Sequence, residues 1–342
     1  MLFNFTKMHG LGNDMILIDD REEKIRNINE FARRILHRNT GVGADNLLIV
    51  RKPSLPGADV RMLILNNDGS EAEMCGNGIR CVARLARERY PEATGERFVV
   101  TSGGREYRIT CEEPIFGVLP TFGVEIPLSL HSDDFAPSLA AEGFVGRTIP
   151  RMECELPFTF LSPGNPHIVA PAAARSEWLF GSDGRLDTGR LSALGERANR
   201  LREVFPKGIN VSLFCRLDEG RIFVATYERG VGITSSCGTA MTSCATAAAL
   251  HGLCGFDKTV EVWNRGGRVR CLPRRTQQGL VTRLTGNAAF EKAGTIRLDE
   301  KGRIAADEAS PLDSPRDRQR LVEETLRELH EYYGLTIADT HD

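Results

Sequence analysis

The chain has 342 residues and a formal net charge of −2, which is enough length for two domains that each bury a core. A hydrophobic content of 41% and a charged content of 26% are those of an ordinary soluble protein. Positive and negative residues are interspersed and no apolar run reaches transmembrane length, so we expect no nucleic-acid partner and no membrane partner.

The nine cysteines are odd in number and irregularly spaced, which argues against a disulfide framework. The first residues, Met-Leu-Phe-Asn-Phe-Thr-Lys, lack the form of a signal peptide. These features together predict a protein of the reducing cytoplasm.

The first elements that we expect are two strands joined by a glycine turn, within residues 3–19. Asn13 lies at that turn, where an asparagine is more often a local backbone cap than a ligand contact. A short helix over residues 29–38 and a strand over residues 47–50 follow, and the glycine-rich segment between them ends at Asn46.

The most informative stretch joins a strand over residues 60–65 to a helix over residues 79–89, and it reads Asn-Asn-Asp-Gly-Ser-Glu-Ala-Glu-Met-Cys-Gly-Asn-Gly. Cys75 stands where the loop becomes the helix, directly before Gly76 and Asn77. Glycines there let an anion approach the unpaired amides of the first turn, and a helix start favours a thiolate over a thiol. A lone cysteine in such a turn is more often buried and inert, so the assignment needs a second example.

The second half of the chain supplies that example. A strand leads to Glu228, and Cys237 then opens a helix over residues 241–250. Asn66 precedes Cys75 by nine residues, and Glu228 precedes Cys237 by the same nine. Because the same spacing occurs twice, we favour a functional role for both cysteines over the interpretation of each as an inert turn residue.

Other segments of the two halves also correspond. Residues 158–169 have the layout of residues 3–18, a strand, a glycine-asparagine turn and an apolar strand. A helical run near residues 188–203 follows, and residues 208–211 occupy the place of residues 41–46. We therefore predict a domain duplication: two pseudo-symmetric α/β halves, with one cysteine from each facing a shared cleft.

A run of prolines between residues 114 and 150 marks the crossover between the halves. Near the end of the chain, a helix carries an apolar stripe of Leu321, Leu326, Leu329 and Tyr333, which we expect to pack on the protein's own core or on another subunit. The segments that we assign are an N-terminal half 1–124 with 286–300 returning to it, a C-terminal half 125–285, and a tail 301–342 with its helix near 314–333.

Two cysteines from opposed halves suit a reaction that attacks one carbon from both faces, as the inversion of a Cα stereocentre requires. One thiolate removes the α-proton and the opposite thiol donates a proton, so each needs a pKa near the working pH. Thiols start near ~8.5 and fall at a helix amino terminus, where amides are also offered to the substrate carboxylate. A pyridoxal-phosphate route would need a Schiff-base lysine, and none stands in a comparable glycine-rich setting, so we expect no cofactor. We also assign no metal site.

At these residues the sequence resembles the diaminopimelate epimerase family of cofactor-independent two-thiol amino-acid epimerases. The resemblance implies an α/β (α+β) fold of two pseudo-symmetric halves, each a mixed sheet wrapped around a central helix, with the active site in the cleft between them. It implies epimerisation of LL-2,6-diaminopimelate to the meso form, in the lysine and peptidoglycan precursor pathway. The resembling segments are residues 7–14, 41–45, 66–80, 164–167, 208–211 and 228–239.

The resemblance also implies roles for individual residues. Cys75 and Cys237 are the acid/base thiols, and His167 with Glu228 resembles the pair that supports thiol protonation. Without the resemblance, the sequence alone would favour a structural role for both residues: His167 as a buried turn residue and Arg229 as a salt-bridge partner of Glu228. The implied substrate contacts are Gly76, Asn77, Gly238 and Thr239 at the α-amino and α-carboxylate groups, and Asn13, Asn46 (often glutamine in the family), Asn66, Asn165, Asn210, Glu228 and Arg229 on the rest of the substrate.

The sequence departs from the family pattern at a few positions. Ala240 stands where a glycine is usual, Asn287 replaces a proline, and Lys292 replaces an aromatic residue associated with dimer contact. The resemblance implies a homodimer, and because of Lys292 we expect either a different dimer interface or that face left open. The alternatives are a racemase of another amino acid, such as histidine or proline, and a ligand-binding relative that has lost catalysis. Arg229 and the asparagines favour a substrate with a second zwitterionic amino-acid group, which histidine and proline lack. The presence of both cysteines argues against a relative that has lost catalysis.

Overall fold

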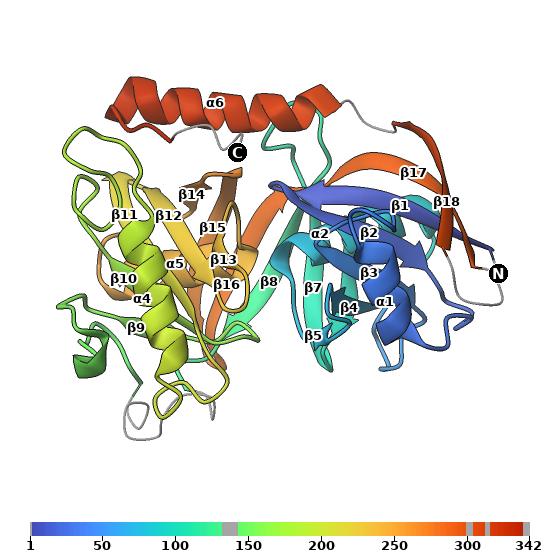
Figure 1. Ribbon diagram of the computed structural model, residues 1–342, viewed down its shortest axis with the longest axis horizontal. Coiled ribbons are helices and arrows are strands. Elements are labelled where there is room, and N and C mark those ends of the chain that lie inside the picture. The colour runs from blue at the N-terminus through green and yellow to red at the C-terminus, as the bar shows by residue number, and fades with distance from the viewer. Residues whose placement is uncertain (1, 132–142, 299–303, 312–314, 338–342) are drawn as a thin grey trace. The chain divides into compact units, whose positions relative to one another are not determined.

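The computed structural model describes residues 2–131, 143–298, 304–311 and 315–337 (Figure 1). The described part has a mixed α+β fold made mostly of strands, with five α-helices. Its contacts divide the chain into two compact units, which are unit 1 with Met1–Glu125 and Thr285–Arg320, and unit 2 with Ile126–Leu284 and Leu321–Asp342.

Unit 1 begins with a hairpin in which β1 (Leu2–Gly10) pairs antiparallel with β2 (Asn13–Asp19). β2 runs parallel to β3 (Asn46–Arg51), and α1 (Ile28–Leu36) makes the crossover that a parallel pair requires. β3 pairs antiparallel with β4 (Val60–Asn66), which is antiparallel to β5 and parallel to β6. The other strands of this unit are β5 (Glu71–Ala72), β6 (Arg97–Ser102), β7 (Arg105–Glu112), β17 (Ala289–Leu298) and β18 (Ile304–Pro311).

Unit 2 repeats this order of elements. β9 (Thr159–Leu161) pairs antiparallel with β10 (His167–Pro171), and β10 runs parallel to β11 (Asn210–Asp218) after the crossover helix α4 (Gly189–Arg200). β11 pairs antiparallel with β12 (Arg221–Glu228), which is antiparallel to β13 and parallel to β14. The remaining elements are η1 (Pro150–Met152), β13 (Gly232–Thr234), β14 (Val260–Asn264) and β15 (Gly267–Thr276), while β8 (Thr121–Leu128) and β16 (Gly279–Asn287) cross the unit boundaries.

Each unit wraps its sheet around one buried helix. α2 (Gly76–Arg89) contacts β1 to β4, and α5 (Gly238–Leu250) contacts β10 to β12 with β14 and β15. Every residue of α5 except Leu250 is buried, and its small uncharged side chains suit a helix with no solvent face. In α2, the first eleven residues are buried although they include Arg80 and Arg84. The predicted fold class of two pseudo-symmetric halves, each with a central helix, is confirmed.

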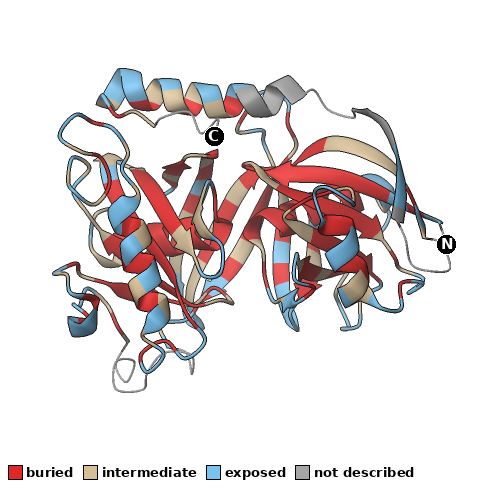
Figure 2. Cartoon of the chain, in the orientation of Figure 1, coloured by how far each residue is buried: buried red, intermediate tan, exposed pale blue. Residues whose placement is uncertain are grey.

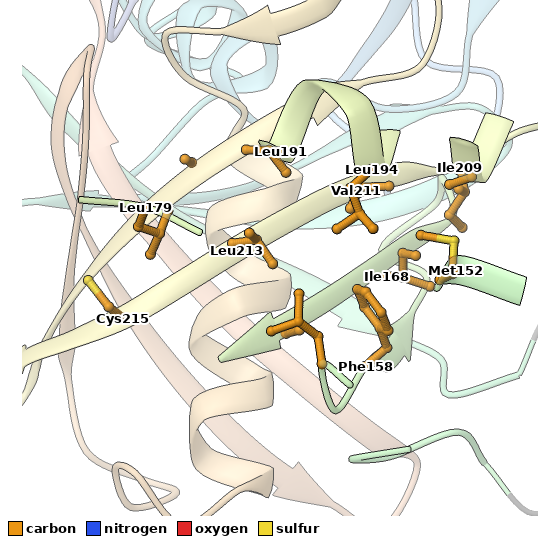
Figure 3. Close-up of a cluster of buried hydrophobic side chains, with 14 of the residues drawn as sticks. Met152, Phe158, Ile168, Leu179, Leu191, Leu194, Ile209, Val211, Leu213 and Cys215 are labelled. Carbon is orange, nitrogen blue, oxygen red and sulfur yellow. The ribbon is translucent and has the colours of Figure 1, made fainter. Parts of the chain in front are cut away.

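The outer helix of unit 2 has a different pattern. α4 is exposed along one side and buried along the other (Figure 2). Figure 3 shows Leu191 and Leu194 of this helix directed toward Val211 and Leu213 of β11, with Ile168 of β10 alongside. The apolar stripe of α4 therefore covers the parallel strands that carry His167 and Asn210 at their starts.

The C-terminal helix α6 (Pro315–Tyr333) covers the residues of the predicted helix, although residue 314 lies outside the described part of the chain. Leu321 and Leu329 are buried, and Leu326 and Tyr333 are half-buried. Leu329 belongs to the core of unit 2, together with Trp263. The stripe thus packs on the protein's own core.

Strand β18 is an element that the sequence analysis did not predict. It pairs antiparallel with β17, with Leu298 opposite Ile304 and Arg297 opposite Ala305. The residues that precede α6 therefore extend the sheet of unit 1. Its sequence, Ile-Ala-Ala-Asp-Glu-Ala-Ser-Pro, has one large apolar residue and lacks the apolar alternation by which strands are recognised.

The packing of α6 leads to a prediction on stability. Leu329→Ala should lower the free energy of unfolding by about 2–5 kcal/mol, because it removes a buried side chain and leaves a cavity. Tyr332→Ala on the same helix is the matched control, since Tyr332 is 68% exposed. Urea unfolding of both variants measures the difference, and an equal effect of the two changes would contradict the packing of α6 on unit 2.

Candidate active site

Cys75 of unit 1 occupies the position before the first residue of α2. Its backbone is extended, with φ −136° and ψ 113°, and the N–H of Gly78 donates to its Sγ at 3.3 Å. The thiol in turn donates to Oδ1 of Asn13 at 3.7 Å. A sulfur that accepts from the helix start and donates to an amide can hold either protonation state there.

Asn13 is held by a charged network that the sequence analysis did not identify. Its Nδ2 donates to Asp45 at 2.8 Å, and Arg38 pairs with Asp45 at 2.7 Å and with Asp14 at 2.9 Å. Lys7 also pairs with Asp14, at 2.9 Å. Burial of Asp14 opposes ionisation, but hydrogen bonds and charges from Arg38 and Lys7 outweigh it and lower the pKa of Asp14 to about 2.

Two further asparagines lie opposite each other on β3 and β4. Asn46 donates from Nδ2 to Oδ1 of Asn66 at 3.0 Å, and Asn66 donates to Oγ of Ser70 at 3.0 Å. Asn77, in the first turn of α2, is almost fully buried, and its Oδ1 accepts a hydrogen bond from Arg80 at 2.9 Å. Arg80 is therefore a residue of this site to which the sequence analysis gave no role.

In unit 2, Cys237 has the same place and backbone as Cys75, with φ −128° and ψ 112° before α5. Its Sγ lies 3.3 Å from Oγ1 of Thr239, and the same hydroxyl lies 3.1 Å from Nε2 of His167. The structure thus connects His167 to the thiol through Thr239. This link could not be read from the sequence, where Thr239 was expected only as a substrate contact.

His167 is fully buried at the start of β10. Its Nε2 is also within 3.2 Å of Oδ1 of Asn165 and 3.3 Å of Nδ2 of Asn210. Burial, with the charge of Arg229, lowers the pKa of His167 to about 3. The imidazole is therefore neutral at physiological pH.

The remaining predicted residues of unit 2 lie at the end of β12. Asn210 accepts the backbone N–H of Arg229 at 2.9 Å, while the exposed Arg229 side chain donates to the carbonyl of Lys207 at 2.9 Å. Glu228 accepts from the hydroxyl of Thr234 at 2.7 Å. The structure thus links Glu228 to the β12–β13 hairpin and His167 to Thr239.

The other cysteines differ in environment from these two. All nine are free thiols, and burial raises the pKa of both Cys81 and Cys215 to about 12. Cys81 lies within α2, six residues after Cys75. The two cysteines differ because Cys75 precedes the first residue of the helix, whereas Cys81 is buried in its interior. A high pKa makes a thiol a poor nucleophile or base at neutral pH.

Within the described ranges, no group of three or more His, Cys, Asp or Glu side chains could hold a metal ion. In the same ranges, no helix is long and apolar enough to cross a membrane.

The fold is that of a known class of proteins. A phenazine biosynthesis protein of the PhzF family from Bacillus anthracis aligns with a TM-score of 0.60 at 17% identity, over 87% of this chain and 99% of the other. A hydroxyproline epimerase from Agrobacterium vitis, with trans-4-hydroxy-L-proline bound, aligns with a TM-score of 0.61 at 14% identity, over 88% and 94%. These structures share the fold of two duplicated α+β halves.

Sequence comparison narrows the assignment further. The family model described as diaminopimelate epimerase matches residues 5–115 and 160–291. Diaminopimelate epimerase of Clostridium acetobutylicum is 34% identical over 305 residues, covering 87% of this chain and 86% of the relative. That of Listeria monocytogenes serovar 1/2a is 32% identical over 343 residues, covering 97% and 98%. The chain belongs to the diaminopimelate epimerase family and is an isomerase, which confirms the predicted family and class and does not favour the alternatives.

The charged network around Asn13 gives a prediction on pH. Because the folded pKa of Asp14 lies below the unfolded value of 3.8, its contribution of about 2 kcal/mol is complete above that value and is lost as pH falls through about 2. The stability difference between the wild type and Asp14→Asn should therefore shrink by about 1 kcal/mol from pH 6 to pH 3. Urea unfolding at both pH values measures it.

Asp183→Asn is the control for this measurement, because Asp183 is exposed. Its effect on the free energy of unfolding should be small and nearly the same at the two pH values. An Asp14→Asn difference that stays constant with pH would contradict the network.

Proposed function

We propose that this protein converts LL-2,6-diaminopimelate to the meso form without pyridoxal phosphate, using Cys75 and Cys237 as the two acid/base groups. The observation that carries the proposal is the repeated placement of a cysteine directly before a buried helix, once in each unit. The curated relatives named diaminopimelate epimerase support the substrate. Nine free thiols support a reducing cytoplasm as the compartment.

The proposed reaction moves one proton to the Cα and one proton from it. A thiolate takes the α-proton, so that the C–H bond breaks, an S–H bond forms, and the electron pair passes to the Cα and its carboxylate. The opposite thiol then gives its proton to the other face of the carbon and becomes a thiolate. The N–H groups at the starts of α2 and α5 stabilise the carboxylate as charge develops on it. Gly76, Asn77, Gly238 and Thr239 are the residues of those first turns.

The two thiols have different support in this proposal. Asn13 and Gly78 contact the sulfur of Cys75 directly, and Thr239 contacts that of Cys237. Since His167 is neutral, it does not supply a fixed positive charge. It acts as a hydrogen-bond partner that orients the Thr239 hydroxyl toward the sulfur.

The rest of the substrate is recognised by the asparagines and by Arg229. Asn66, Asn165 and Asn210 offer amide donors and acceptors, and an arginine holds a carboxylate in a bidentate fork. This set suits the second amino-acid head of diaminopimelate. A homodimer is proposed as the assembly, with Lys292 in the position that relatives give to an aromatic residue.

The chemistry is tested by reaction in deuterium oxide. The wild type should convert LL-diaminopimelate to the meso form with deuterium at the α-carbon, because the proton that is delivered comes from a solvent-exchanged thiol. Cys75→Ala and Cys237→Ala should each lose at least about a thousandfold in turnover, since each removes the only acid/base group on one face. Cys154→Ala is the matched control, a half-buried cysteine outside the site. Full turnover by either single variant would rule out the two-thiol reaction.

Substrate choice is tested separately by kcat/KM. Diaminopimelate should exceed lysine, histidine and proline by at least about a thousandfold, because a single-headed amino acid leaves the groups for the second head unsatisfied. Arg229→Lys should lose activity although it keeps the charge, because the planar fork is lost. Histidine or lysine turned over as well as diaminopimelate would overturn the substrate and leave the thiol chemistry standing.

A further inference from the structure

Arg80 is a buried cation in the first turns of α2. It is among the largest fully buried side chains of the described residues. Its Nη1 donates to the carbonyl of Gly76 at 2.8 Å, its Nη2 to Oδ1 of Asn77 at 2.9 Å, and its Nε to the carbonyl of Asn287 at 3.3 Å. Burying a guanidinium is costly unless such bonds compensate it, and two of these three acceptors belong to the first two residues of the helix.

The surrounding backbone is shaped for this guanidinium. A Cβ on Gly286 would lie 3.0 Å from both Nε and Cζ of Arg80, and one on Gly10 would lie 3.2 Å from its Nη2. Strands β1 and β16 therefore approach the guanidinium with glycine. Asn287 offers its main-chain carbonyl, which a proline also has, so the departure from the family residue at 287 leaves this contact intact.

The corresponding position of unit 2 holds a neutral residue. Thr242 follows Cys237 by five residues, as Arg80 follows Cys75, and its Oγ1 donates to the carbonyl of Gly238 at 2.8 Å. In both helices the carbonyl of the first residue thus accepts a side-chain hydrogen bond, from the guanidinium of Arg80 in α2 and from the hydroxyl of Thr242 in α5. Because a hydroxyl is sufficient for that bond, the positive charge in α2 calls for another explanation.

We propose that Arg80 is a positioning residue: it fixes Asn77 and the first turn of α2, and it places a permanent positive charge behind the helix start that carries Cys75. The proposal rests on the role proposed above for Cys75. A cation near a thiol favours the thiolate and attracts a carboxylate. Arg80 therefore makes Cys75 the more acidic of the two thiols and tightens the carboxylate cradle of unit 1.

The test measures alkylation of each thiol by iodoacetamide against pH, with peptide mass spectrometry to separate Cys75 from Cys237. The variants are Arg80→Met, which removes the charge, and Arg80→Lys, which keeps it without the fork. Arg84→Met is the matched control, because Arg84 lies one turn further along α2, donates to the carbonyl of Ala288 at 2.8 Å and covers the ring of Phe290 at 3.9 Å. The other charged or titratable side chains on the strands in contact with α2 are unchanged in every variant: Lys7, His9, Asp14, Asp19, Arg51 and Arg61.

Arg80→Met should raise the midpoint of Cys75 alkylation by roughly half to one pH unit and leave that of Cys237 in place. Arg80→Lys should leave the Cys75 midpoint near that of the wild type but raise KM for diaminopimelate, because Asn77 loses the fork. Arg84→Met should lower stability without moving either midpoint.

Equal shifts in Arg80→Met and Arg84→Met, or an unmoved Cys75 midpoint in Arg80→Met, would overturn the proposal. If Arg80→Met does not fold, Arg80→Lys becomes the deciding variant. An unchanged midpoint of Cys75 alkylation together with a raised KM would support the proposal, and an unchanged KM would overturn it. Alkylation requires no turnover, so a shift confined to Cys75 would stand even if diaminopimelate proved not to be the substrate.

Discussion

When the start of a helix is buried, its first N–H groups have no water to bond and need other acceptors. In both α2 and α5 the residue before this buried start is a cysteine. In α2 the sulfur of Cys75 accepts the N–H of Gly78, and in α5 the sulfur of Cys237 pairs with the hydroxyl of Thr239. The residues at the start of each helix, Gly76 in α2 and Gly238 in α5, carry no side chain, which lets an anion approach the first amides. The buried helix start that organises each unit is therefore also the feature on which the proposed reaction depends.

The duplicated fold is not duplicated in its charges. In unit 1 the surroundings of the thiol are ionic, with the buried Asp14 and Arg80 and with the exposed Arg38 paired to Asp14. In unit 2 the groups nearest the thiol are the neutral Thr239 and His167, and burial together with the charge of Arg229 keeps His167 uncharged. The groups around the two thiols therefore differ, although the backbone at the two cysteines is nearly the same.

Much of this could be predicted from the sequence, because the informative residues are local. The glycines after Cys75 and Cys237, the equal spacing to Asn66 and Glu228, and the apolar runs of the strands each report on their own neighbourhood. The structure accordingly places Asn13 at Cys75, pairs Asn46 with Asn66, and joins Asn165 and Asn210 to His167.

The rest depends on contacts between distant segments, which no local pattern records. Arg80 has the sequence context of a surface arginine on a helix, and only the approach of Gly286 and Asn287, some two hundred residues later, encloses it. The pairing of Arg38 with Asp14, 24 residues earlier, also joins separate elements. β8 was overlooked because Pro127 lies within it and its surroundings are rich in proline, a composition typical of a linker.

The central claim is that the two repeats bring one thiol each to the same substrate carbon. Treating the substrate-free protein with diamide and mapping its peptides tests this proposal most directly, because two thiols that act on one carbon should be able to form a disulfide. The account predicts a Cys75–Cys237 disulfide that reductant reverses and diaminopimelate prevents. Oxidised protein in which both of these thiols remain free, or in which other cysteines pair instead, would contradict it.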